Sequence, residues 1–350
     1  MTQAPSGAEL REPTLDDVIA ARGRLLGVVR RTPLWPLAIE TPGGHPVFVK
    51  PESLQAVGSF KIRGALNFLS SMEPEVRERG VVAQSSGNHA QGGAAAARHF
   101  GVKATIVIPD GAPQLKVDNT RALGAEVVRC ANTQDAREST AQEIADRTGA
   151  TLVPPYDHPW IVAGQGTVGA EIVEDLPDVA NVIAPIGGGG LVSGVALAVR
   201  SLSEGAQVIG VEPELAADAH DSLQKGAPQK WTAEQVTRTL ADGVRTQCIG
   251  QLNFDLMQRL LAGVVRVDEE SLVRNVAWYA TKAKLVVEPT GTLSLSAFQR
   301  LLAEGQVEGI ELKAGPTVLV VSGGNIDPRL LTELLTRVAA GASGDYPGVQ

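Results

Sequence analysis

Cysteine is scarce in this chain, with Cys130 and Cys248 as the only two among 350 residues. Neither belongs to a CxxC pair, so the sequence indicates neither a disulfide framework nor a zinc site. Such sparse thiols suit a reducing compartment, and we expect a cytoplasmic protein. The first residues are charged without an apolar segment, and no apolar run reaches membrane-spanning length, so we expect neither a signal peptide nor a membrane partner.

An excess of basic charge is also missing. The formal net charge is −8 and the isoelectric point is near 5.3. Nucleic-acid backbones require basic stripes, so this balance argues against non-specific nucleic-acid binding and favours a small-molecule partner. Apolar residues make up 43% of the chain and charged residues 20%, which is typical of a packed globular protein.

The order of apolar runs predicts an α/β fold with two lobes. Strand-like runs at 81–83, 104–109 and 126–130 alternate with helical stretches at 88–100, 114–123 and 134–148. The same rhythm returns with strands at 182–186, 208–211 and 318–321 and a helix at 191–202, whereas the stretch 214–232 is predicted to be a loop. Runs such as 105–108 are apolar throughout, as expected for parallel strands that are covered on both faces. We expect two open, twisted sheets with a cleft between them.

Lys61 is the first candidate for chemistry. It lies in the run SFKIRGA at 59–65, in which small residues allow a flat ring to approach the backbone. A cation at Arg63 would disfavour the ammonium form of Lys61 and help to supply the free amine that Schiff-base chemistry needs. Arg63 is equally compatible with a structural ion pair.

A run of four glycines follows the strand that ends at Ile186 and opens onto a helix. Successive bare amides at such a place bind anions, phosphate above all. The spacing of Gly188, Gly190 and Gly194 also resembles a dinucleotide-binding loop, with Glu212 near the position of a ribose-binding acid. A nicotinamide-dependent oxidoreductase is therefore the rival hypothesis.

A third stretch, SSGNHAQG at 85–92, brings polar groups and free amides to another strand-to-helix turn. Together with AGQGT at 163–167, GGGGLVSG at 187–194, EPT at 288–290 and SGGN at 322–325, it makes the chain resemble the fold-type II pyridoxal-phosphate (PLP) enzymes. The resemblance is to the branch that holds threonine and serine dehydratases, serine racemase and 3-hydroxyaspartate dehydratase, and it extends over nearly the whole chain. It implies the fold of the tryptophan synthase β-subunit, with PLP in the cleft between a large domain (1–69 and 159–350) and a small mobile domain (70–158).

The resemblance also assigns roles around the cofactor. Lys61 would form the Schiff base with PLP, beside the ring of Phe60, and Asn88 would bind the cofactor's phenolic oxygen. Ser322 would meet the pyridine nitrogen with a neutral hydroxyl, which favours elimination over transamination. The phosphate would be held by Gly187, Gly188, Gly189 and Gly190.

The substrate would be a small hydroxyamino acid, held through its α-carboxylate. Lys61 would remove the α-proton on one face of the ring, and Ser86 would lie on the other face, which leaves racemisation open. The loop that binds the carboxylate would consist of Ser85, Ser86, Gly87, Asn88 and His89.

The expected activity is thus ammonia release from L-threonine or L-serine, with serine racemase and threo-3-hydroxyaspartate dehydratase as alternatives. A catalytically silent PLP-binding or amino-acid-binding protein is a further alternative. The resemblance further implies a divalent-cation site for Mg²⁺ or Ca²⁺ made by Glu212, Ala216 and Asp218, and a homodimer.

Overall fold

A computed structural model describes residues 11–85, 87–112 and 114–341 of the protein. Its larger sheet has six strands in the order β1-β2-β12-β7-β8-β9, and all of them run parallel except β1, which pairs antiparallel with β2. The bounds are β1 Trp35–Leu37, β2 Val47–Pro51, β7 Asn181–Pro185, β8 Gln207–Pro213, β9 Gly263–Val267 and β12 Thr317–Val321. A short hairpin of β10 (Gln306–Val307) and β11 (Ile310–Glu311) lies outside this sheet.

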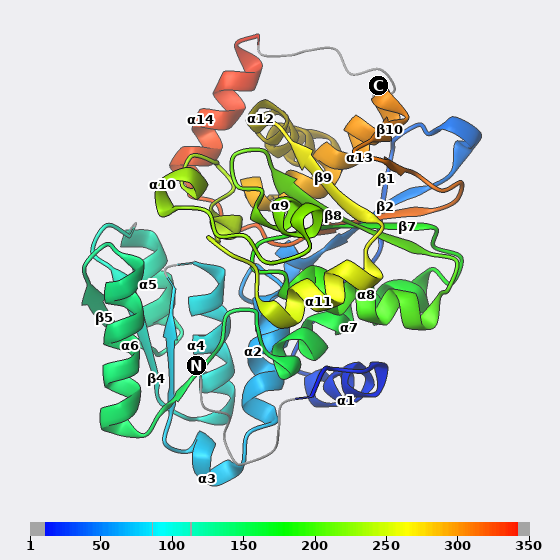
Figure 1. The fold of residues 1–350 in the computed structure, drawn as a ribbon. Coiled ribbons are helices and arrows are strands. Elements are labelled where there is room, and N and C mark those ends of the chain that lie inside the picture. Colours follow the sequence, from blue (N-terminus) through cyan, green and yellow to red (C-terminus); the bar gives the residue numbers. More distant parts are fainter. Residues whose placement is uncertain (1–10, 86, 113, 342–350) are drawn as a thin grey trace.

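The smaller sheet has four parallel strands in the order β5-β4-β3-β6. Its strands are β3 Val81–Gln84, β4 Ala104–Pro109, β5 Glu126–Cys130 and β6 Thr151–Leu152. All six residues of β4 are buried, as the apolar run predicted. Figure 1 shows this sheet and its helices as a distinct layer at the lower left, apart from the larger sheet above.

Helices cover both faces of the larger sheet because successive strand residues point to opposite sides. Leu319 and Val321 of β12 pack into one core with Leu293 and Phe298, whereas Val318 and Val320 pack into the other core. The first two partners belong to α13, and the second core includes residues of α7 and α8. In Figure 1, α1, α7, α8 and α11 lie together below this sheet, and α12 and α14 lie above it.

The four helical stretches that the sequence predicted, at 88–100, 114–123, 134–148 and 191–202, are helices in the structure, whereas most of the other helices were not predicted. The bounds are α1 Leu15–Leu25, α2 Lys61–Ser70, α3 Pro74–Arg77, α4 Asn88–Phe100, α5 Gln114–Ala122, α6 Gln134–Thr148, α7 Pro159–Asp175, α8 Gly190–Leu202, α9 Asp218–Lys225, α10 Ala233–Val236, α11 Gln251–Leu260, α12 Glu269–Trp278, α13 Leu293–Glu304 and α14 Pro328–Ala339. The loop predicted at 214–232 was wrong in its middle, because α9 occupies it. Gly226 follows α9 with a left-handed φ of 71°, and such a residue ends a helix readily.

The topology places several sequence motifs at one edge of the larger sheet. Strands β7 and β12 are parallel neighbours, so the glycine run after β7 and Ser322 after β12 both follow carboxyl ends of strands. Ligands of open α/β sheets bind at this edge.

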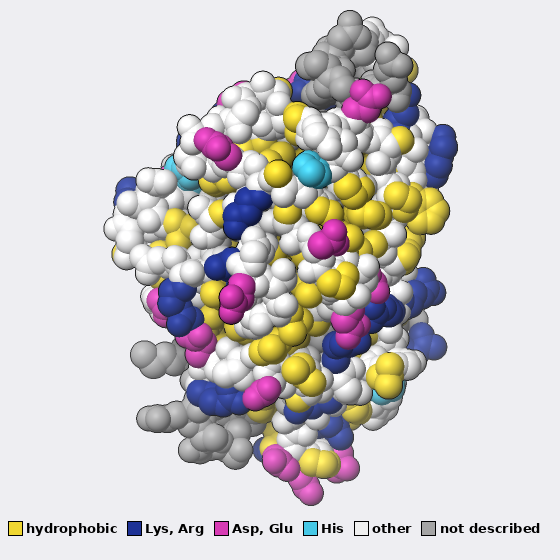
Figure 2. All heavy atoms as spheres, turned by 90° about the vertical axis from the view of Figure 1, so that its right-hand side faces the viewer, with side chains coloured by type: hydrophobic (Ala, Val, Ile, Leu, Met, Phe, Trp, Pro, Cys, Tyr) yellow, Lys and Arg dark blue, Asp and Glu magenta, His cyan; other side chains and the backbone are white. Residues whose placement is uncertain are grey.

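The surface agrees with the overall charge balance. Figure 2 shows Lys and Arg side chains interspersed with Asp and Glu on the visible face, with apolar side chains between them. None of the helices in the described ranges combines the length and the apolar character that crossing a membrane requires.

Candidate active site

Lys61 begins α2, and its amine faces the segment that follows β6. Its Nζ donates a hydrogen bond of 2.7 Å to the carbonyl of Pro155 and lies 5.2 Å from the ring centroid of Phe60. Helix α4 packs closely behind it, since a Cβ added to Gly92 would lie 3.1 Å from the Cβ of Lys61. Burial lowers the pKa of Lys61 to about 8. The site therefore favours the neutral amine more than water does.

Arg63 contributes to this site as a structural ion pair and not as an electrostatic activator. It lies two positions after Lys61, roughly 200° around the helix, so the two side chains point to opposite sides. Its guanidinium donates to Glu52 at 2.7 and 2.8 Å and to Glu171 at 2.7 and 2.9 Å. The hypothesis that Arg63 lowers the pKa of Lys61 is wrong, because burial alone accounts for that shift. The ion-pair alternative is confirmed.

The four glycines join β7 to α8 in a conformation that side chains would disturb. Gly189 has a left-handed φ of 97°, and a Cβ added to Gly188 would lie 2.1 Å from Cγ of Tyr156. A Cβ at Gly190 would come within 2.9 Å of the Tyr156 carbonyl. The loop thus keeps bare backbone at the N-terminus of a helix of 13 residues, where an anion is stabilised.

Ser322 lies immediately beside the segment that carries Lys61. The backbone N–H of Phe60 donates to the carbonyl of Ser322 at 3.1 Å, and Ser59 pairs with Gly323. Ser322 is buried, and its hydroxyl has no hydrogen-bond partner among the residues that the structure describes. An orphaned buried hydroxyl at this edge calls for a polar partner from outside the chain.

Asn88 belongs to a chain of polar side chains in the same region. Its Nδ2 donates to Glu288 at 2.7 Å, and its Oδ1 accepts from Asn325 at 2.7 Å. Asn325 also donates to the carbonyl of Val57 at 2.8 Å. Burial, and next the charge of Asp242, raise the pKa of Glu288 to about 7. The second hydrogen on Nδ2 of Asn88 is left for another acceptor.

The loop predicted to bind substrate is only partly described. Ser86 lies outside the described residues. Ser85 accepts a hydrogen bond of 3.1 Å from the N–H of Gly87, and Nε2 of His89 is 3.1 Å from the carbonyl of Val153. Burial, and next the charge of Lys61, lower the pKa of His89 to about 3, so its ring is neutral. The substrate-binding role of this loop stays a prediction.

The three residues of the expected cation site gather at the start of α9. Glu212 accepts hydrogen bonds from the N–H groups of Ala219 (3.0 Å) and His220 (2.7 Å), and Ala216 is buried beside them. Asp218 is buried, and within the described part of the chain its Oδ2 has no hydrogen-bond partner. Burial raises the pKa of Asp218 to about 7, and burial together with Asp218 raises that of Glu212. Within the described ranges, no group of three or more His, Cys, Asp or Glu side chains could hold a metal ion.

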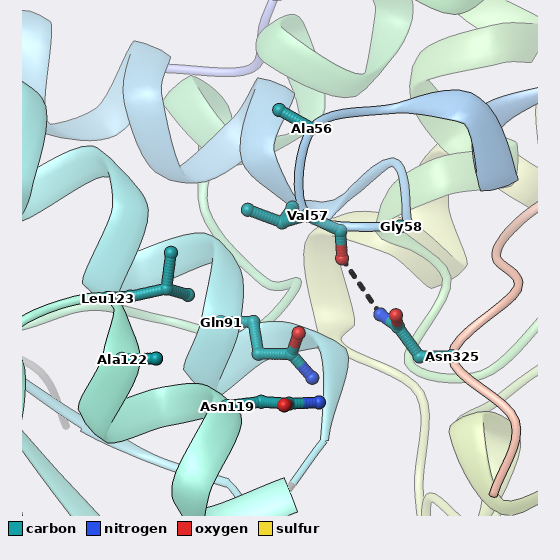
Figure 3. A pocket seen from close by; sticks show the side chains of 8 residues that line it. All are labelled: Ala56, Val57, Gly58, Gln91, Asn119, Ala122, Leu123 and Asn325. Atoms are coloured by element: carbon teal, nitrogen blue, oxygen red, sulfur yellow. Dashed lines mark hydrogen bonds between the residues drawn. The ribbon is translucent and has the colours of Figure 1, made fainter. Parts of the chain in front are cut away.

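A separate cavity of about 250 Å³ lies beside the segment that precedes Lys61 (Figure 3). Asn325, whose amide bonds to Val57, closes one side of it, and Gln91 and Asn119 face it from α4 and α5. Neither Lys61 nor the glycine run lines this cavity. Its full lining is Ala56, Val57, Gly58, Gln91, Asn119, Ala122, Leu123 and Asn325.

A lysine with a lowered pKa, a glycine cradle at a helix N-terminus and an orphaned serine hydroxyl define a PLP-binding α/β enzyme, and these residues fit that cofactor. The chain matches the family "Pyridoxal-phosphate dependent enzyme" over residues 25–323, and it belongs to this family. The rival oxidoreductase hypothesis is therefore wrong. Gly194 serves packing, since a Cβ there would lie 2.3 Å from the carbonyl of Val162 in α7.

Similar proteins span several activities of this family. The chain is 40% identical to L-threonine ammonia-lyase of Thermotoga maritima, over 93% of this chain and 78% of that one. It is 41% identical to L-threo-3-hydroxyaspartate ammonia-lyase of a Pseudomonas species, over 91% of this chain and 97% of that one. The solved structure of maize serine racemase matches with a TM-score of 0.81 at 31% identity and covers 94% of this chain and 99% of that one. The predicted family and fold class are confirmed.

Sequence reasoning missed several residues of this region. Pro155 and Tyr156 contact Lys61 and Gly188, but they belong to none of the motifs, and only the structure shows their position. Glu288 and Asn325 lie within the EPT and SGGN motifs, which was the available signal, but only the structure shows that both bind Asn88.

Proposed function

We propose that this chain is a PLP-dependent ammonia-lyase that converts L-threonine or L-serine to 2-oxobutanoate or pyruvate and ammonia. The observation that carries the proposal is the buried amine of Lys61, with a pKa near 8, one residue after Phe60, whose backbone is hydrogen-bonded to Ser322. The similarity to L-threonine ammonia-lyase supports the choice of substrate.

Each residue around the cofactor has a separate role in the proposed reaction. PLP, when bound, supplies the electron sink that stabilises negative charge at the substrate Cα. Lys61 would hold the cofactor through Nζ and take the proton from Cα once the substrate amine has displaced it. The neutral hydroxyl of Ser322 would face the ring nitrogen without forcing it to stay protonated. Gly187 to Gly190 would bind the phosphate, and Asn88 would donate its remaining Nδ2 hydrogen to the phenolic oxygen.

The direct test is keto-acid release from a panel of hydroxyamino acids. We expect the purified protein to be yellow, to lose its visible band on borohydride treatment with the adduct at Lys61, and to release keto acid from L-threonine or L-serine. Lys61→Ala should remove both the band and the activity. A yellow protein without keto-acid release from these two substrates would contradict the proposed activity and favour a silent PLP-binding protein.

Two related activities share the same machinery. Since a similar protein acts on L-threo-3-hydroxyaspartate, that substrate belongs in the panel. Racemisation needs a second base opposite Lys61, and Ser86 is the residue that the sequence offers. D-serine formed from L-serine, and its loss in Ser86→Ala with elimination retained, would support that role.

The divalent cation belongs to the proposal as a structural or activating ion at Glu212, Asp218 and the carbonyl of Ala216. The unpartnered Oδ2 of Asp218 supports a ligand at this place. Chelator should lower the activity or the melting temperature, and Asp218→Ala should abolish that sensitivity. An unchanged response to chelator in both proteins would remove the cation from the proposal.

The organisation of the enzyme is proposed from the same resemblance. Residues 70–158 would form a small domain that moves against a large domain of 1–69 and 159–350, and two chains would form a cytoplasmic homodimer. The separate sheet built from residues 81–152 supports the domain division. Sedimentation velocity measures the oligomeric state, and hydrogen exchange with and without substrate measures the movement of residues 70–158.

A further inference from the structure

The segment from Pro155 to Asp157 lies between β6 and α7. Its three residues contact, in turn, Lys61, the glycine loop and the start of α11. The carbonyl of Pro155 accepts from Lys61, and the ring of Tyr156 covers Gly188. The carboxylate of Asp157 faces the backbone N–H groups that begin α11, and a Cβ added to Gly250 would lie 2.2 Å from its Cγ. Helix α11 is therefore anchored to the segment that faces the lysine.

Asn253, in the first turn of α11, connects this anchor to the glycine loop. It is fully buried, and its Nδ2 donates to the carbonyls of Gly188 at 2.9 Å and Tyr156 at 3.3 Å. The N–H of Gly250 donates to the same Gly188 carbonyl at 3.2 Å. The Oδ1 of Asn253 accepts no hydrogen bond from any residue in the described ranges, so in that part of the chain this side chain acts as a donor.

These bonds determine where the next amide points. In a trans peptide the carbonyl and the following N–H point in opposite directions. Because the Gly188 carbonyl is held on the α11 side, the N–H of Gly189 is turned away from α11. The side chain of Asn253 also lies close to Gly189, since a Cβ there would be 2.7 Å from the Cβ of Asn253. The orientation of the Gly188–Gly189 peptide thus depends on Asn253.

We infer that Asn253 is a positioning residue for the phosphate of PLP: it fixes the Gly188–Gly189 peptide with the Gly189 N–H facing the phosphate, and Asp157 holds α11 so that Asn253 reaches that peptide. The inference rests on the proposed phosphate site at Gly187 to Gly190. Asn253 binds the carbonyls of Gly188 and Tyr156, so its effect passes through the loop.

The test compares PLP with pyridoxal, which has the same aldehyde and ring but no phosphate. Apo-protein is titrated with each, and binding is followed by the visible absorbance of the lysine adduct. The dissociation constant of pyridoxal divided by that of PLP reports the contribution of the phosphate. Asn253→Asp keeps the side-chain shape but replaces the donor with an acceptor opposite the Gly188 carbonyl.

We expect the ratio of the pyridoxal constant to the PLP constant to fall about tenfold or more in Asn253→Asp and also in Asn253→Ala, which adds no charge near the phosphate, since a hydrogen bond to the charged phosphate is lost. The pyridoxal constant should stay within about threefold of wild type in both variants. The matched control is Asn275→Asp. Asn275 is equally buried, donates to Ser296 at 2.8 Å and Gln299 at 3.0 Å, and also has an unpartnered Oδ1, but it lies in α12. Its ratio should stay at the wild-type value.

The outcomes separate the inference from the proposed function. A wild-type ratio near one would refute the phosphate site itself. A normal wild-type ratio that Asn253→Asp leaves unchanged, or an equal weakening of PLP and pyridoxal, would overturn the role of Asn253 alone. If Asn253→Asp does not fold by circular dichroism, Asn253→Ala takes its place and must lower the same ratio.

Discussion

Replacement of Arg63 by Met tests two roles of this buried charge on α2, its contribution to stability and its effect on the reactivity of Lys61. Arg63 is 1% exposed and donates to Glu52 and Glu171, and Lys50 pairs with Glu171 at 2.7 Å. The cluster therefore holds two cations and two carboxylates. Burial alone would raise the pKa of Glu52, but Arg63 beside it holds that pKa below its usual value. Without Arg63, Lys50 alone remains to neutralise two buried carboxylates.

The expected cost follows from that imbalance. Removing one partner of a buried pair costs about 3–5 kcal/mol, because an uncompensated buried charge is left behind. We expect Arg63→Met to lower the free energy of unfolding of the apo-protein in urea by that amount. Arg63→Lys keeps the charge but not the planar fork that bridges Glu52 and Glu171, so we expect an intermediate loss. The control is Arg337→Met, which breaks an exposed pair with Glu270 and should cost less than about 1 kcal/mol.

The same variant tests what lowers the pKa of Lys61. If burial is the cause, the pH midpoint for the reaction of the apo-protein's Lys61 with PLP should stay near 8 in Arg63→Met. A midpoint that moves toward 10.5 would restore Arg63 as an electrostatic activator and refute the structural interpretation. An unfolding free energy within about 1 kcal/mol of wild type would refute the claim that the cluster is an essential buried network.

The remaining predictions concern single groups of the site. Because the pKa of Lys61 is lowered from 10.5 to about 8, the unfolded apo-protein binds more protons than the folded one between these pH values. The contribution of this lysine to the free energy of unfolding in urea should therefore rise with pH in that window, and it should vanish in Lys61→Met. The pKa of Glu288 is raised from 4.5 to about 7, so its contribution should instead fall as pH rises through that range, and Glu288→Gln should flatten the profile in the same assay. Gly188→Ala should weaken PLP binding about tenfold or more, because its Cβ would collide with the Tyr156 ring; Gly205→Ala, in open space, should not change the dissociation constant, and equal constants for both variants would contradict the close packing at Gly188.

Six strands of the two sheets could be predicted because their signal is local, whereas β1, β2, β6 and β9 were missed. Runs such as 104–109 and 126–130 are bounded by turn residues, and the strands β4 and β5 have these same bounds. Helix α9 was missed because Pro213, Gly226 and Pro228 marked its surroundings as a loop. The helix forms between them, with acids in its first turn and Gly226 at its end, and both features are also helix signals.

The candidate site could be predicted only where its residues lie in recognisable motifs. The partners of Arg63 are 11 and 108 positions away in the sequence, so the sequence left its role open. Tyr156 and Asn253 are 97 positions apart and meet only because α11 packs against the segment after β6. A sequence motif identifies residues that contact a cofactor. The residues that hold these in position are scattered along the chain and come together only through tertiary packing.

Helix α2 separates two requirements that oppose each other. A reactive amine needs a site that disfavours its charge, whereas a buried guanidinium needs carboxylates that stabilise its own. Had Glu52 and Glu171 faced Lys61, their charge would have raised its pKa and kept the amine protonated. The offset of two positions between Lys61 and Arg63 directs the carboxylates to the rear of the helix, where they anchor it, and the amine instead donates to the uncharged carbonyl of Pro155. The ion pairs that anchor this helix and the low pKa of its lysine therefore belong to opposite faces of the same turn.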